Sequence, residues 1–334
     1  MLTTLPPSPQ HGLGFSALVL LIGLISGSLI GHAATPALAE SISQYSDPTL
    51  LTLITLLFFS LRFNLVINSR HKLKVLVIAV IANFVLVPVI GYGIASVFLS
   101  DYPLLMVGLV IYFMSPCTDW FLGFTRLCHG DTLLGAALLP VNMVLQLLLY
   151  PVFLYVFTSD VVTIEPGILA NTLQHWFIEP LALALAARVL LNLLLTKEQM
   201  RALQAAISQL IPILISLLIM QIFAGNIHVL LSHINVVAWL LLAVFCFFVL
   251  TFVLSELLSK RFALPYAEHV LLTMTIAARN APLMLAVTMV ALPSQPLIYA
   301  AIVIGMLLEF PHLTLLSHLL MRSSQTKTKK LLHD

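Results

Sequence analysis

Long apolar runs follow one another along most of the chain, and each is about 20 residues long or more, the length that an α-helix needs to cross a bilayer. Only 8% of the residues are charged, whereas a soluble domain carries about 25%. The runs predict helices near residues 13–33, 48–68, 73–99, 103–128, 131–158, 168–195, 202–224, 232–257, 265–291 and 296–321. The sequence therefore predicts an all-α polytopic membrane protein with ten transmembrane helices.

The basic residues predict the orientation of these helices. Every Lys and Arg except Arg279 lies at alternate connections or in the basic tail at residues 322–334. The other connections contain acidic residues but no Lys or Arg. Positive charge accumulates on the cytoplasmic side of membrane proteins. We therefore expect a multi-pass protein of the cell membrane, in a bacterium the inner membrane, with both termini and the short tail in the cytoplasm. The first run lacks a preceding Lys or Arg, which favours a membrane helix over a signal peptide.

Two of the runs are interrupted by proline at corresponding positions. The fourth contains Ser-Pro-Cys-Thr-Asp-Trp at residues 115–120, and the ninth contains Ala-Arg-Asn-Ala-Pro at residues 278–282. Proline breaks or kinks a helix, and a break at membrane depth survives only against protein or a polar cavity. Because each half then has five helices, an odd number, the half at about 168–321 is expected to be an inverted repeat of the half at about 13–158.

Paired discontinuous helices in inverted repeats are typical of secondary transporters with a binding site near the bilayer midplane. We therefore expect helices four and nine to be discontinuous and to cross each other. Residues 1–334 are expected to form a single membrane transporter domain.

Four charged residues stand out within the predicted spans, because a charge at the bilayer centre costs about 2.5–3.5 kcal/mol on insertion scales. Asp119 and Arg279 lie at the two breaks, so they could form an ion pair that either fixes the crossing or takes part in transport. Glu309 precedes Pro311 in the tenth run and is a candidate proton or coupling-ion site, or a structural glutamate. Glu179 in the sixth run is a weaker candidate.

Several uncharged polar residues accompany these charges. The thiolate of Cys117 could bind a soft metal or metalloid, although a buried cysteine often acts only as a small hydrophobe. Asn142 and Gln146 are four residues apart on one helix face, where they could bind a cation or solute or join helices. The candidate substrate-binding residues are Cys117, Ser115, Thr118, Asp119, Arg279 and Asn280, and the candidate coupling residues are Glu309, Asp119, Asn142 and Gln146. No spacing indicates a metal site, and Asp131 is predicted to start a helix.

These motifs resemble those of a known family. The stretch at residues 115–120, Gly-Asp at 130–131, Ala-Arg-Asn-Ala-Pro-Leu-Met-Leu-Ala-Val at 278–287 and the segment from Gly305 to Pro311 resemble helices four, five, nine and ten of arsenical-resistance (arsenite) permeases, within the bile acid:sodium symporter superfamily. The resemblance covers most of the chain and implies ten helices arranged as a panel domain and a core domain. It also implicates Cys117 in metalloid transport and Glu309 in the transport cycle.

The chain departs from that family at both breaks. Arsenite permeases place apolar residues after the cysteine, where this chain has Thr-Asp-Trp at residues 118–120. The sodium-coupled branch of the superfamily places a carboxylate at the ninth-helix break, where this chain has Arg279. A fixed positive charge there argues against a sodium site of that kind.

Together these features predict a secondary active transporter that moves a small solute by alternating access and is not an enzyme. The leading hypothesis is metalloid (arsenite) efflux by antiport with protons, and the alternative is a sodium- or proton-coupled organic-anion symporter in which Arg279 receives the substrate's acid group. A membrane substrate sensor is a more distant alternative. Expected partners are a small-molecule or metalloid substrate, a coupling ion (proton, or sodium) and the lipid bilayer, with no cofactor and no nucleic acid.

Overall fold

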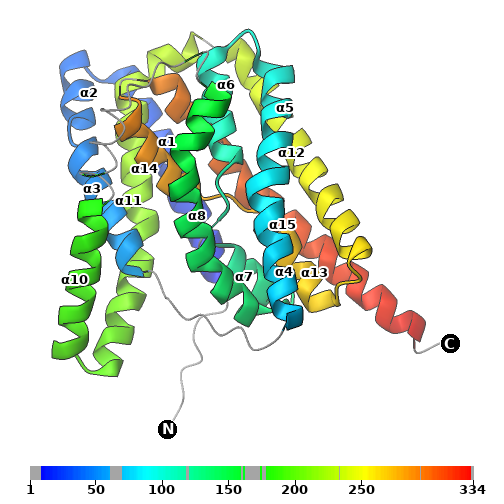
Figure 1. The fold of residues 1–334 in the computed structure, drawn as a ribbon. Coiled ribbons are helices and arrows are strands. Elements are labelled where there is room, and N and C mark those ends of the chain that lie inside the picture. Colours follow the sequence, from blue (N-terminus) through cyan, green and yellow to red (C-terminus); the bar gives the residue numbers. More distant parts are fainter. Residues whose placement is uncertain are drawn as a thin grey trace. The chain divides into compact units, whose positions relative to one another are not determined.

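The computed structural model describes residues 9–60, 70–117, 120–158, 161, 174, 178–232, 234–293 and 295–331, and within them every regular element is a helix (Figure 1). The elements are α1 (Pro9–Ala33), α2 (Pro36–Ser43), α3 (Ser46–Ser60), α4 (Arg70–Ile81), the π-helix η1 (Ala82–Leu86), α5 (Val87–Leu99), α6 (Pro103–Phe113), α7 (Trp120–Leu127), α8 (Thr132–Thr158), α10 (Glu179–Leu194), α11 (Lys197–Leu231), α12 (Ile234–Arg261), α13 (Tyr266–Ala277), α14 (Ala281–Ala291) and α15 (Pro296–Leu331).

Among the described residues, four helices are long and apolar enough to cross a membrane, or five if the bent helix α8 counts as one span. The four cover His71–Leu99, Lys197–His228, Asn235–Arg261 and Pro296–Arg322. The fourth and ninth predicted spans are each divided by a break, which leaves two shorter helices in place of one long one. The multi-pass, all-helical class is therefore confirmed.

Two helices extend beyond the apolar runs that predicted them. Helix α11 begins and ends well beyond the predicted 202–224, and α15 continues to Leu331 through most of the predicted tail. Hydropathy detects only the apolar part of a helix, whereas Lys, Gln and Arg are good helix formers in water. A helix that leaves the bilayer can therefore continue with polar residues.

The chain divides into two compact units, whose bounds are Met1–Leu61, Pro166–His233 and Ala286–Pro296 for the first, and Arg62–Glu165, Ile234–Leu285 and Leu297–Asp334 for the second. The first unit contains α1, α2, α3, α10 and α11. The second contains α4 to α8, α12, α13 and nearly all of α15. Each unit thus takes helices from both predicted halves of the chain.

In the first unit, glycines on α1 allow close packing against α11. A Cβ atom added to Gly23 would lie 2.3 Å from the carbonyl oxygen of Ser216, and one added to Gly27 would lie 2.5 Å from that of Met220. Gly31 makes the same approach to Ala224 one turn further on. Small residues at such four-residue spacing let membrane helices approach closely. This contact was not predicted from the sequence.

In the second unit, α5 runs beside α6 and α12 (Figure 1). Glycines again mark the tightest contacts: Gly108 on α6 faces the backbone of Ile298 on α15, and Gly305 on α15 faces the ring of Tyr112.

Proline by itself does not end a helix in this protein, because α8 continues through Pro140 and Pro151 with a 52° bend, and α15 continues through Pro311.

Candidate site at the two helix breaks

The two predicted breaks are present, and they lie against each other within the second unit. Helix α6 ends at Phe113 before α7 begins at Trp120, and α13 ends at Ala277 before α14 begins at Ala281. Residues 116 and 279 form an antiparallel bridge. The Cys117 N–H donates to the Ala278 carbonyl at 3.0 Å, and the Asn280 N–H donates to the Ser115 carbonyl at 2.8 Å. The two extended segments therefore satisfy part of each other's backbone. We call residues 114–117 with 278–280 the crossing.

The side chain of Arg279 is 1% exposed and donates to oxygen atoms around the crossing. Its guanidinium reaches the carbonyl of Phe113 at 2.9 Å and that of Thr275 at 3.0 Å, and it also donates to the carbonyl of Ile276. The amide oxygen of Asn83 accepts at 3.4 Å. The Arg279 Nε atom is buried without a hydrogen-bond partner among the described residues. The buried charge is thus compensated mainly by carbonyl dipoles.

Glu309 on α15 caps the same break from another side. The residue is 0% exposed. Its Oε1 atom accepts the backbone N–H of Arg279 at 3.0 Å, and its Oε2 atom accepts the Tyr112 hydroxyl at 3.4 Å. The predicted candidate carboxylate therefore contacts the ninth-helix break directly.

The amide side chain of Asn142 on α8 forms a third edge of the crossing, and Gln146 lies one turn further along the same helix. Asn142 is 0% exposed, and its amide nitrogen donates to the carbonyl of Cys117 and to the Thr275 hydroxyl, both at 3.4 Å. The Asn142 Oδ1 atom and both polar atoms of Gln146 are buried with no hydrogen-bond partner among the described residues. Buried polar groups are almost always paired in native proteins, so these unpaired atoms indicate a place for a polar ligand.

The other candidate residues have different surroundings. Cys117 is 3% exposed and Asn280 is 6% exposed, both within the crossing. The Ser115 hydroxyl donates to the Ile111 carbonyl of the preceding helix α6 at 2.7 Å, which is a local structural role. Thr118 and Asp119 lie outside the described residues, so the ion pair between Asp119 and Arg279 stays a prediction.

Glu179 stays only a predicted span residue, because most of residues 168–178 lie outside the described residues. It is the first residue of α10 and is exposed. An acidic side chain is favourable in the first turn of a helix, where it faces the positive end of the helix dipole. The helix dipole therefore gives Glu179 a structural role at the start of α10.

Three residues at the crossing were not predicted from the sequence. Asn83 belongs to η1, and its amide nitrogen donates to the Thr275 hydroxyl at 3.0 Å. Tyr112 contacts Glu309 from α6. The one available signal for Asn83 was an asparagine within an apolar run. Its π-helical turn is of a kind that often occurs at functional positions, but hydropathy cannot reveal such a turn. Thr275 and Tyr112 carry no sequence signal of their own.

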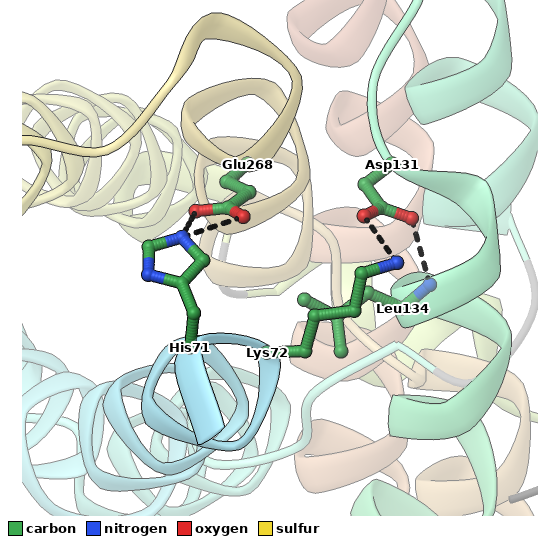
Figure 2. Close-up of polar contacts among 5 residues, drawn as sticks. All are labelled: His71, Lys72, Asp131, Leu134 and Glu268. Carbon is green, nitrogen blue, oxygen red and sulfur yellow. Dashed lines mark hydrogen bonds and ion pairs between the residues drawn. The ribbon is translucent and has the colours of Figure 1, made fainter. Parts of the chain in front are cut away.

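A separate group of polar contacts joins helix ends in the second unit, as Figure 2 shows. His71 at the start of α4 contacts both carboxylate oxygens of Glu268 on α13 at 2.9 Å. Lys72 lies 3.4 Å from Asp131, whose other oxygen accepts the Leu134 N–H at 2.9 Å. Asp131 is thus the N-cap of α8, as predicted. These contacts fix the ends of three helices.

An all-helical membrane protein in which two interrupted helices meet around buried polar side chains belongs to the class of membrane transporters. The model of the Sodium Bile acid symporter family matches residues 47–233, which is more than half of the chain. The chain belongs to this family. The matched segment contains Cys117, Asn142 and Gln146 and ends before Arg279 and Glu309. No curated protein matches the chain.

Proposed function

We propose that the chain is a secondary active transporter that moves a small solute by alternating access, with its binding site at the crossing. The unpaired amide atoms of Asn142 and Gln146 carry this proposal. A buried polar group without a partner costs about 1–3 kcal/mol, so a bound solute that pairs with these atoms recovers that energy. A solute bound there touches both broken helices of the second unit.

The division of the chain supports ten helices in two inverted five-helix repeats within one transporter domain. The helices that begin each half, α1 to α3 and then α10 and α11, lie in the first unit, whereas α4, α5 and α12, which directly precede the broken helices, lie in the second. The broken helices and their following neighbours lie mainly in the second. Two repeats that each fold in the same way would divide the chain between the two units like this. Alternating access would follow from movement of one unit against the other.

We propose a metalloid, arsenite, as the solute, exported by antiport with protons. Cys117 supplies a thiol within the crossing, and thiolate is the protein ligand that soft metalloids prefer. Glu309 supplies a carboxyl group that contacts the break and can carry a proton. Arsenite is largely uncharged near neutral pH, so its binding needs no further counter-charge.

An organic-anion symporter is the second candidate, because one observation favours it. The Arg279 Nε atom has no acceptor among the described residues and could donate to a carboxylate or sulfonate. The other donors of that guanidinium already meet protein oxygens, which leaves little of it for a substrate. We therefore place this function second, and a membrane substrate sensor behind it.

Uptake of arsenite into everted membrane vesicles tests the first proposal. Cys117→Ser is expected to lower proton-gradient-driven uptake about tenfold or more, since loss of 1.4 kcal/mol of binding is already tenfold. Cys246→Ser is the matched control, because this free cysteine lies in α12 outside the crossing, and it should keep wild-type uptake. Normal uptake by Cys117→Ser would contradict a thiol mechanism, whereas uptake of a labelled organic acid without any arsenite uptake would favour the second candidate.

A further inference from the structure

The ninth-helix break leaves carbonyl oxygens without their usual donors. In an uninterrupted helix, the Thr275 carbonyl would accept the N–H of Arg279, four residues later. Here that N–H donates to Glu309 instead. The Ile276 carbonyl would likewise accept the N–H of Asn280, which donates across the crossing. Both carbonyls are taken by the Arg279 guanidinium.

The fourth-helix break does the same to a third carbonyl. The Phe113 carbonyl would accept the N–H of Cys117, but that N–H donates to Ala278. The Arg279 guanidinium takes this carbonyl as well. One side chain therefore replaces the lost donors of two different helices, and the amide oxygen of Asn83 completes the group of four acceptors.

Four oxygen atoms of this kind are also suitable ligands for a hard metal cation. Carbonyl and amide oxygens bind such ions, and unwound helices and half-helix C-termini coordinate sodium in membrane transporters. The negative ends of α6 and α13 both converge on this point, which favours a positive charge. We call the oxygen atoms of Phe113, Thr275, Ile276 and Asn83 the oxygen cage.

We propose that the Arg279 guanidinium is a tethered cation that fills the oxygen cage, so that this break neither binds nor requires sodium. The inference rests on the proposed function, because it concerns the ion coupling of the same crossing. A guanidinium stays protonated in proteins, and the face of the Phe247 ring lies 5.8 Å from it, so the positive charge is permanent and well accommodated. Position 279 therefore carries a cation and not a sodium ligand, although the family is named for sodium symport.

The proposal predicts that removal of the arginine side chain creates a cation site. The thermal unfolding midpoint of the purified full-length protein in detergent is measured in NaCl, KCl and choline chloride at equal ionic strength. Wild type and Arg279→Lys should have the same midpoint in all three salts. Arg279→Ala should have a lower midpoint in choline chloride and a saturable rise with sodium or with low guanidinium concentrations. That rise should be on the order of 5 °C at a hundredfold excess over the Kd.

Arg188→Ala is the matched control, because this arginine also donates to a backbone carbonyl, that of Phe59, but in the first unit. It should not become sensitive to sodium. A folded Arg279→Ala protein that is indifferent to both ions would overturn the proposal. If that variant cannot be purified, wild type and Arg279→Lys decide, since a saturable, sodium-specific rise in either contradicts a filled cage. The measurement involves no transport, so a failure to carry arsenite leaves its result unaffected.

Discussion

At the scale of single residues, the crossing is held together by side chains that replace missing helix hydrogen bonds. Arg279 supplies donors, Glu309 supplies an acceptor, and Asn142 supplies a donor to Cys117. Rare polar residues in apolar runs were visible in the sequence, because their cost in a membrane requires a reason. Their partners were not, since a residue such as Thr275 becomes important only through what lies beside it.

The roles of Glu309 as acceptor and as proton carrier can be separated by two substitutions. Glu309→Gln keeps an oxygen for the Arg279 N–H but cannot exchange a proton, so it should fold normally and lose proton-gradient-driven arsenite uptake while retaining arsenite exchange. Glu309→Leu also leaves that N–H unpaired, which should lower the free energy of unfolding by about 1–3 kcal/mol.

Uptake and exchange in vesicles, together with thermal unfolding of the purified variants, measure these effects. Gradient-driven accumulation that persists in Glu309→Gln would show that the proton binds elsewhere. A Glu309→Leu protein as stable as wild type would show that the N–H of Arg279 finds another acceptor.

At the scale of elements, proline predicted two breaks correctly but could not by itself separate a break from a bend. Helix α8 continues through Pro151, whereas the chain leaves the helical conformation at Pro116. The difference is tertiary: the extended segment around Pro116 finds backbone partners on residues 278–280. A helix can end inside a membrane protein only where such partners exist.

The packing of α1 against α11 gives a prediction at this scale. Gly27→Leu places a side chain where a Cβ atom alone would lie 2.5 Å from the Met220 carbonyl, so the helices must separate. Overpacking of this kind costs about 1–3 kcal/mol, and we expect a thermal midpoint several degrees below wild type. Gly93→Leu on α5 is the control, since an added Cβ there meets nothing within 4 Å. Equal midpoints for the two variants would mean that α1 and α11 do not pack closely.

At the scale of the whole molecule, charge distribution predicts that both termini are cytoplasmic. Green fluorescent protein fused after residue 334 should fluoresce, and alkaline phosphatase fused there should be inactive. Phosphatase inserted after Asp101 in an acidic connection should be active instead. Cell-based fluorescence and phosphatase assays measure this, and an active phosphatase at the C-terminus would contradict the orientation.

The sequence by itself determined the class of the protein, the places of its two breaks and the rare polar residues near them. Hydropathy and proline act locally along the chain, and so they can be read without a fold. Only the tertiary structure brought the Arg279 guanidinium to the carbonyls of two different helices and to Asn83 of a third. Those partners lie up to 196 residues from Arg279 along the chain, and no local rule relates them to it. At sequence level Arg279 was a charge in need of a counter-charge, whereas in the fold carbonyl dipoles from the broken helices surround it.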